Sequence, residues 1–331
     1  MLYFIQYERG LIMQNDNYKY QEQLAAIAQD FYLSRLTISE LSTKYSLSRY
    51  LIKKSLDEAI SSGLVTVSIN SPLSRNFALE MQFQKKFGLK NIYIIKDSSN
   101  PEEDQKKIIE YAAEQLQLLI KKSKVVGLAW GGTVYNVIDH FKNQIQADLI
   151  FTQFMGENMK YHSQAGSMRM VEKAANKFST GFTTLAAPLY IINKRLKNEL
   201  RQEPAFKQTF IYASRMDLIF TGLGTLASID SIACWKQNKK AIFPGVDQEK
   251  IAGILYGRPY DIQGNFLVSN ETDTVFGADI DTILAVPHRL AIVKSKFKAK
   301  AALGALRGHL ITDLVIDEAI ANRILLEASI S

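Results

Sequence analysis

The fold of the larger part of this chain is decided by the stretch Val125-Val126-Gly127-Leu128-Ala129-Trp130-Gly131-Gly132-Thr133. It begins as a short apolar run, which is typical of a strand buried on both faces. A glycine-rich turn follows, and residues 134–141 continue with the spacing of a helix. A buried strand that leads through a tight turn into a helix begins a βαβ unit, so we expect a parallel sheet.

The same alternation of strand and helix patterns continues through residues 77–331. Strands are predicted at residues 91–95, 125–129, 148–154, 218–221, 283–286, 290–293 and 310–315. The clearest helical patterns lie at residues 101–122, 163–177, 298–307 and 318–328. Strands that alternate with helices predict an open, Rossmann-like α/β sheet, in which ligands bind at the carboxyl ends of the strands.

A second turn of the same kind, Thr221-Gly222-Leu223-Gly224-Thr225, follows the strand predicted at residues 218–221. Turns of this kind present backbone N–H groups, which attract anions at a helix N-terminus. A tight strand-to-helix connection would explain either turn alone equally well, and neither is a P-loop. Two of them at strand ends in one sheet favour a ligand there. The candidate binding residues in these turns are Gly131, Gly132, Thr133, Gly222, Gly224 and Thr225.

Two further features each allow two interpretations. Lysines occupy alternate positions from Lys294 to Lys300, and they could form a solvated ladder, or one of them could reach an anionic ligand. Asp261, in the turn of residues 260–265, could accept a hydrogen bond from a ligand hydroxyl or brace its own turn. The 4 histidines show no metal-ligand spacing, and no nucleophile, base and orienting group come together. We therefore expect no metal, no cofactor and no catalytic site.

Residues 1–66 have a different pattern, in which three helices precede a short strand at residues 64–69. The helices are predicted at residues 20–33, 37–45 and 49–61, with Thr37 and Ser48 as their capping residues and Gly63 as a stop. This order is that of a winged helix-turn-helix. Residues 67–76, which are polar and contain Pro72, are predicted to be a linker.

The second helix of a helix-turn-helix lies in the major groove of DNA, where its first residues contact base edges. Arg49 is the candidate for reading a base because its guanidinium matches the acceptors of guanine, whereas the lysines suit phosphates. An ordinary three-helix domain with a charged, solvated face, or an oligomerisation unit, is the alternative. The candidate DNA-binding residues are Ser39, Lys44, Ser48, Arg49, Tyr50, Lys53 and Lys54.

Charge and composition narrow the class of protein. The 331 residues carry a net charge of +7, yet residues 1–66 are neutral and concentrate their positive charge between Arg35 and Lys54. The excess in the rest of the chain favours a second anionic partner. No apolar run is long enough to span a membrane, no signal peptide is recognisable, and a single cysteine, Cys234, favours a cytoplasmic location. Because the predicted fold begins only after it, Met13 rather than Met1 is expected to be the natural start.

With these motifs in this order, the chain resembles the SorC/DeoR-type sugar-binding transcriptional regulators, from about residue 20 to residue 328. The likeness includes Ile38-Ser39-Glu40-Leu41 with Leu47-Ser48-Arg49, the segment Gly127–Thr133, and Ala187-Pro188-Leu189-Tyr190. It continues through Asp217–Gly224, Gly257-Arg258-Pro259-Tyr260-Asp261 with Gly264, and Lys298–Ala319.

The resemblance implies a helix-turn-helix joined to an effector domain related to sugar-phosphate isomerases. It also implies operator DNA and a phosphorylated sugar as partners, a dimer or tetramer formed by residues 77–331, and Lys298 at the phosphate site. This chain has Ile254 where the family usually has an acidic residue, and Lys294-Ser295 where it usually has two glycines. A different phosphorylated metabolite, or a regulator that has lost its effector, therefore stays open. A sugar-phosphate isomerase with a regulatory N-terminal domain is the alternative from another class.

Overall fold

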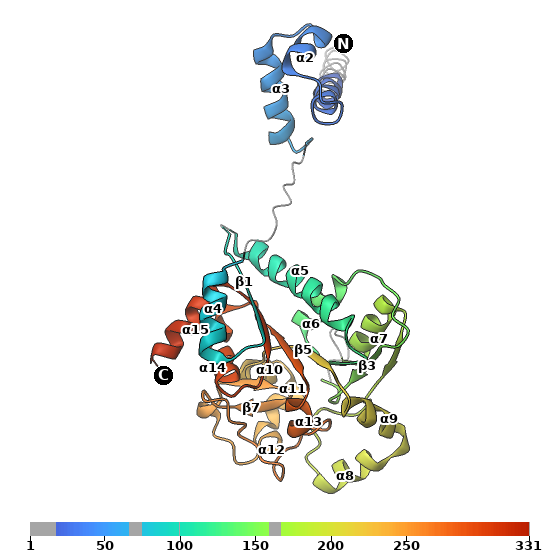
Figure 1. Cartoon of the computed structure of the whole chain (residues 1–331), viewed down its shortest axis with the longest axis vertical. Coiled ribbons are helices and arrows are strands. Elements are labelled where there is room, and N and C mark those ends of the chain that lie inside the picture. The colour runs from blue at the N-terminus through green and yellow to red at the C-terminus, as the bar shows by residue number, and fades with distance from the viewer. Residues whose placement is uncertain (1–17, 66–74, 99, 159–166, 331) are drawn as a thin grey trace, which may run out of the picture. The chain divides into compact units, whose positions relative to one another are not determined.

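The computed structural model describes residues 18–65, 75–98, 100–158 and 167–330. The chain divides into two compact units, residues 1–72 and residues 73–331 (Figure 1). Met1, Met13 and most of the predicted linker lie outside the described residues. No helix in the described part of the chain is both long enough and apolar enough to cross a membrane.

The N-terminal unit consists of three helices around a small core. A helix of residues 18–32 precedes α2 (Ile38–Tyr45) and α3 (Arg49–Ser61), as predicted. Thr37 and Glu40 form a capping box at the start of α2, and the hydroxyl of Ser48 accepts a hydrogen bond from the Leu51 N–H at the start of α3. The core is made by Ile27, Ala28, Leu41, Ile52, Leu56 and Ala59.

The strand predicted at residues 64–69 is not seen in its described part. Leu64 and Val65 form a bend, and the rest of the segment lies outside the described residues. The Leu51 side chain is 43% exposed, because α3 presents Ile52, Leu56 and Ala59 inward.

The C-terminal unit is built on a parallel sheet of seven strands among the described residues, which confirms the predicted open α/β fold. Its strands in spatial order are β1 (Asn91–Ile95), β9 (Asp313–Asp317), β8 (His288–Ile292), β5 (Leu218–Gly222), β2 (Val125–Leu128), β3 (Ile150–Gln153) and β4 (Gly181–Thr183). All neighbouring strands in this sheet pair in parallel. The strands are short, and all except the edge strand β4 are mostly buried, as expected for a sheet covered on both faces.

The strand order places a switch point between β2 and β5. From β2 the chain proceeds through β3 to β4 at one edge, whereas from β5 it proceeds through β8 to β9 towards the other. Connections that leave two adjacent strands in opposite directions open a crevice at the strands' carboxyl ends, and ligands bind in such crevices.

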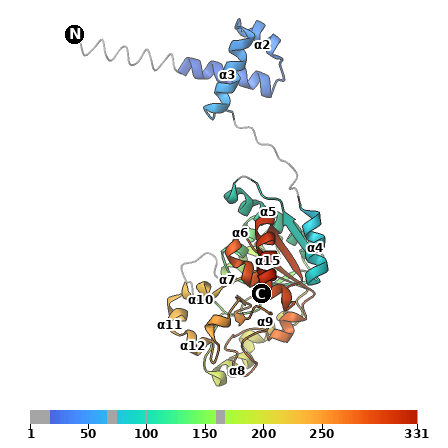
Figure 2. The same ribbon diagram turned by 90° about the vertical axis from the view of Figure 1, so that its left-hand side faces the viewer.

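Helices cover both faces of this sheet (Figure 1). One layer contains α5 (Pro101–Ile120), α6 (Gly132–Asp139) and α7 (Ser167–Phe178), and the other contains α4 (Phe77–Phe87), α14 (Ala299–Arg307) and α15 (Glu318–Ile330). The remaining helices are α8 (Lys194–Gln202), α9 (Pro204–Ala213), α10 (Leu226–Asp230), α11 (Ala233–Gln237), α12 (Lys239–Ile242) and α13 (Ile280–Leu284). Figure 2 shows α10, α11 and α12 side by side at one end of the unit.

One predicted strand is wrong, and three strands were not predicted. Residues 283–286 do not form a strand, since Ile283 is the buried residue of helix α13. The strands missed are the exposed edge strand β4 and the antiparallel hairpin of β6 (Gly253–Leu255) and β7 (Arg258–Tyr260). The 310–315 prediction begins too early, because β9 starts at Asp313.

Near the start of the C-terminal unit, Arg75 is held in place by hydrogen bonds to a buried carboxylate. The guanidinium of Arg75 donates two hydrogen bonds, of 2.8 and 2.6 Å, to the carboxylate of the buried Glu80. That carboxylate also accepts a hydrogen bond of 2.9 Å from the Ile94 N–H in β1. The Asn76 N–H also donates a hydrogen bond of 2.8 Å to the carbonyl oxygen of Ile94, so residues 75 and 76, which the predicted linker included, are attached to the sheet.

Candidate functional site

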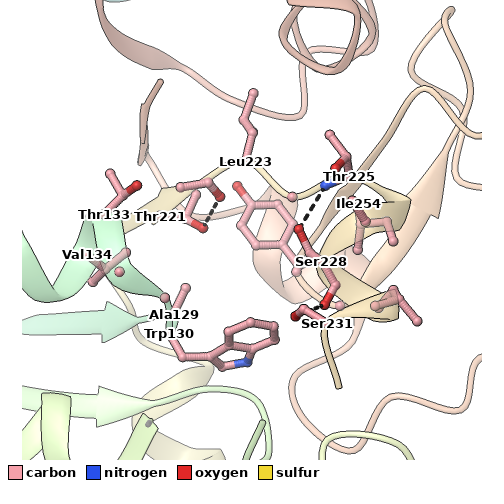
Figure 3. A pocket seen from close by; sticks show the side chains of 18 of the residues that line it. Ala129, Trp130, Thr133, Val134, Thr221, Leu223, Thr225, Ser228, Ser231 and Ile254 are labelled. Carbon is pink, nitrogen blue, oxygen red and sulfur yellow. Dashed lines mark hydrogen bonds between the residues drawn. The ribbon is translucent and has the colours of Figure 1, made fainter. Parts of the chain in front are cut away.

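A cavity of about 470 Å³ lies at the switch point, where β2 and β5 end (Figure 3). Much of its wall comes from residues 129–134 directly after β2 and from residues 221–225, which are the last two residues of β5 and the turn that follows. Helix α10, the β6–β7 hairpin and the side chain of Lys298 supply much of the rest. The cavity therefore occupies the place that the strand order marks for a ligand.

The turn after β2 opens the N-terminus of α6 to this cavity. Gly131, at the N-cap of α6, has φ +128°, a value that L side chains rarely adopt. No side chain in the described part of the chain caps α6. A Cβ atom added at Gly131 or Gly132 would meet nothing within 4 Å, so the turn faces open space. Uncapped N–H groups facing open space attract an anion.

Residues from the second turn lie beside the first. A Cβ atom on Gly222 would be 3.4 Å from the Cβ of Thr133, so a larger residue at 222 would crowd the Thr133 side chain. Gly224 pairs with Ile254 of the hairpin through two backbone hydrogen bonds of 3.0 and 2.9 Å. In Figure 3, Thr225 and Ile254 lie across the cavity from Thr133. The glycines thus let three segments of backbone come close together.

Lys298 brings the only charged side chain among the described lining residues. Its ammonium donates a hydrogen bond of 2.6 Å to the carbonyl oxygen of Leu223, and no described carboxylate forms an ion pair with it. Burial lowers the pKa of Lys298, and the nearby charge of Lys294 lowers it further. An anion bound beside this ammonium would stabilise its charged form and raise its pKa, against both of these influences.

Asp261 is the one candidate ligand-binding residue that the structure places outside the cavity lining. Its carboxylate accepts hydrogen bonds from the N–H groups of Gln263 and Asn265, each at 2.9 Å, and from the Asn265 side chain at 3.1 Å. These bonds lower the pKa of Asp261 against the opposing effect of burial. Its contacts are those of a residue that braces its own turn.

The other seven candidates, Gly131, Gly132, Thr133, Gly222, Gly224, Thr225 and Lys298, all line the cavity. The sequence alone did not identify the aromatic part of the wall. Trp130 and Tyr190 line the cavity, and both rings pack on Trp235, with centroid distances of 5.7 and 4.9 Å. Trp130 belongs to the segment of residues 125–133, which follows a single strand into its turn. Tyr190 and Trp235 lie far apart in the sequence and become neighbours only through tertiary packing.

The candidate DNA-binding residues all lie at the surface of the N-terminal unit. Tyr50 is 74% exposed at the start of α3, and the Arg49 guanidinium donates a hydrogen bond of 3.0 Å to the hydroxyl of Ser39 in α2. Lys53 and Lys54 are exposed and form no ion pair with a described residue. An exposed arginine and two unpaired lysines on one helix suit a polyanion.

Two of these candidates also have structural roles. Ser48 caps α3, and the Lys44 ammonium pairs at 2.6 Å with the carboxylate of Asp30. The hydrogen bonds from Lys44 and from the Tyr45 hydroxyl lower the pKa of Asp30. The charge of Lys44 is therefore balanced by that of Asp30, which weakens the attraction of Lys44 for a phosphate.

Named regulators from other bacteria align with this sequence over nearly the whole chain. The sorbitol operon regulator of Klebsiella pneumoniae is 23% identical over 305 residues, which cover 91% of this chain and 97% of that protein. The transcriptional regulator LsrR of Escherichia coli strain K12 is 22% identical over 312 residues, which cover 92% of this chain and 95% of LsrR.

Solved structures show the same fold. The crystal structure of the full-length sorbitol operon regulator SorC from Klebsiella pneumoniae matches with a TM-score of 0.69 and 23% identity, covering 92% of this chain and 98% of that one. A transcriptional regulator from Streptococcus pneumoniae TIGR4 matches with a TM-score of 0.67 and 20% identity, covering 76% and 97%.

The family model described as "Putative sugar-binding domain" matches residues 71–326. This match takes in the whole parallel sheet and every described residue that lines the cavity. The chain belongs to this sugar-binding domain family, as its resemblance to the SorC/DeoR-type regulators implies.

Proposed function

We propose that this protein is a transcription regulator that binds operator DNA through α2 and α3 and binds a phosphorylated sugar or related metabolite in the switch-point cavity. One observation carries the proposal: the uncapped N-terminus of α6, the hydroxyl of Thr133 and the ammonium of Lys298 all line one cavity at the switch point. Together they offer a phosphate ester backbone donors, a hydroxyl and a positive charge.

The two units supply the two activities of such a regulator. The N-terminal unit carries the exposed residues of α3 for the major groove, and the C-terminal unit carries the cavity. We propose that the C-terminal unit also forms a dimer or tetramer, whose symmetry sets the spacing of the operator half-sites. An operon regulator of this kind acts in the bacterial cytoplasm.

An isomerase-like enzyme is the weaker alternative. The relatives named above are regulators, which favours a protein that binds its sugar phosphate without converting it. Among the described lining residues there is no carboxylate, histidine or cysteine to act as a general base at the cavity. Incubating the full chain with sugar phosphates and measuring isomer formation by NMR tests this, and turnover would favour the enzyme.

A thermal-shift screen of the full chain against phosphorylated sugars tests the effector site. We expect a hit to raise the melting temperature of the wild-type protein, and we expect Thr133→Val combined with Lys298→Ala to abolish that shift. Lys300→Ala is the matched control, because Lys300 is an exposed lysine that does not line the cavity. A shift of equal size in the double variant would place the effector elsewhere.

A further inference from the structure

Helix α10 presents a row of hydroxyl groups to the part of the cavity that lies away from α6. Thr225 is the N-cap of α10, Ser228 lies within the helix and Ser231 is its C-cap. Because these residues recur at intervals of three, they share one face of the helix. All three line the cavity, and Figure 3 shows Thr225 and Ser228 across the cavity from Thr133. The row therefore faces the part of a ligand that lies beyond a phosphate bound at the α6 turn.

The hydroxyls of Thr225 and Ser228 keep their hydrogen atoms available for a ligand. The Ser228 hydroxyl accepts a hydrogen bond of 3.2 Å from the Thr225 N–H, which holds its oxygen in place. Neither hydroxyl donates a hydrogen bond to another group in the described part of the chain. Both side chains are half-buried, so a ligand that displaces water from them has to supply an acceptor, or two donors are left unpaired.

Two other hydroxyls of the same wall can accept hydrogen bonds. Ser231 donates to the carbonyl oxygen of Ser228, and Thr221 donates to that of Gly222, both at 2.8 Å. Their hydrogen atoms are used, but their oxygens keep lone pairs. The wall thus combines donors with acceptors, and a hydroxyl group of a ligand can use both, because it donates and accepts at once.

We propose that Thr225 and Ser228 select the effector by donating hydrogen bonds to hydroxyl groups of its carbon body. The ligand of the cavity is then a phosphate monoester of a polyhydroxyl compound, namely an aldose, a ketose or a polyol. This inference rests on the proposed binding of the phosphate by Lys298 and the α6 turn, and it assigns the wall that reads the rest of the molecule. Such a wall rejects an analogue that lacks the hydroxyls, because the analogue leaves the protein's donors unpaired.

Calorimetric titration of the wild-type full chain with two groups of phosphate monoesters tests the selectivity. Ribose 5-phosphate, glucose 6-phosphate and fructose 6-phosphate carry several hydroxyls, whereas pentyl phosphate and cyclohexyl phosphate carry the same charge and no hydroxyl. We expect the tightest hydroxylated ester to bind roughly tenfold or more tightly than either hydroxyl-free ester, as two hydrogen bonds would give. A hydroxyl-free ester that binds as tightly as the best hydroxylated one would overturn the proposal.

Two variants at Thr225 test the assignment of the wall. Thr225→Val removes the hydroxyl and keeps the β-branched shape, whereas Thr225→Ser keeps the hydroxyl. The quantity to compare is the affinity for the best hydroxylated ester divided by that for a hydroxyl-free ester. Thr225→Val should lower this ratio about fivefold, the size of one hydrogen bond, and Thr225→Ser should leave it near the wild-type value. A general loss of stability would weaken both esters alike and would not change the ratio.

Ser228→Ala should lower the same ratio by a similar factor, although it also removes the acceptor of the Thr225 N–H. Ser214→Ala is the matched control and should leave the ratio unchanged. Ser214 is an exposed serine that ends α9 as Ser231 ends α10, and it lies outside the cavity lining. An unchanged ratio in Thr225→Val or in Ser228→Ala would overturn the proposed role of these hydroxyls.

Lys298→Ala separates failure of this proposal from failure of the proposed function. If esters of both groups bind with equal affinity and lose binding in Lys298→Ala, the effector site stands and only the inference about its hydroxyl wall fails. If no ester shows binding that depends on Lys298, the proposed effector site fails, and this inference fails with it.

Discussion

Substituting Asp317 by asparagine should stabilise the C-terminal unit relative to the wild type, and this gain in stability should be larger at neutral pH than at acidic pH. Asp317 ends β9 with its side chain only 8% exposed, and it accepts a hydrogen bond of 2.7 Å from the Ile320 N–H at the start of α15. Burial raises its pKa to about 6; the hydrogen bond from the Ile320 N–H opposes this rise, and the charges of Asp97 and Asp104 add to it. Asparagine keeps an acceptor oxygen and removes the charge.

The sign and size follow from the pKa difference. A carboxyl with a pKa of about 6 when folded, against 3.8 for an ordinary aspartate, binds its proton more tightly in the folded state. The folded state therefore loses stability as the pH rises from about 4 to 6 and keeps that loss above it. At 1.36 kcal/mol for each pH unit, the loss is about 3 kcal/mol, which Asp317→Asn should relieve.

Urea unfolding followed by tryptophan fluorescence measures this loss cleanly, because both tryptophans of the chain, Trp130 and Trp235, belong to the C-terminal unit. We expect the free energy of unfolding of Asp317→Asn, minus that of the wild type, to grow by about 2–3 kcal/mol between pH 4 and pH 7.5. Asp148→Asn is the control, since Asp148 is exposed in the same unit. A difference between Asp317→Asn and wild type that does not change with pH would refute the reasoning.

Three further substitutions, two of them compared with a second variant, examine the proposed DNA-binding face, the core of the N-terminal unit and a crowded turn. Arg49→Ala should cost about 1–3 kcal/mol of binding to the operator and relax the preference at one base pair, whereas Lys53→Ala should weaken binding to all sequences alike. Titrations of operator and random DNA separate the two, and a uniform loss for Arg49→Ala would make Arg49 a phosphate contact. Leu41→Ala empties a position that is 0% exposed, and its cost of about 2–5 kcal/mol should unfold much of the small N-terminal unit. Far-UV circular dichroism should then show helix loss without a change in the tryptophan-detected transition, and wild-type helix content would contradict this. Gly264 has φ +86°, and a Cβ there would lie 2.3 Å from the backbone just after α14, so Gly264→Ala should destabilise the C-terminal unit by about 2–5 kcal/mol. Gly245→Ala is the control, because Gly245 has φ +74° with nothing within 4 Å of an added Cβ, and equal losses in urea unfolding would show that the clash contributes nothing.

The regular parts of the fold could be read from local patterns. Caps at Thr37 and Ser48 set the starts of α2 and α3 to within one residue, because a cap acts on its own backbone. Residues 283–286 were misjudged because a run of four apolar residues suits a buried strand and a buried helix turn equally well. The edge strand β4 gives no apolar signal, since its residues are largely exposed.

By itself, the sequence determined the strand-turn-helix at residues 125–141 and, with it, a parallel sheet with glycine-rich turns at the carboxyl ends of its strands. Such turns depend on backbone conformation, which glycine encodes locally. Only the tertiary structure decided that Lys298 and Ile254, which are distant in sequence from Thr133, line the same cavity, and that Asp261 does not. The parallel strand order brings these segments together, and strand order depends on packing between elements rather than on any local pattern.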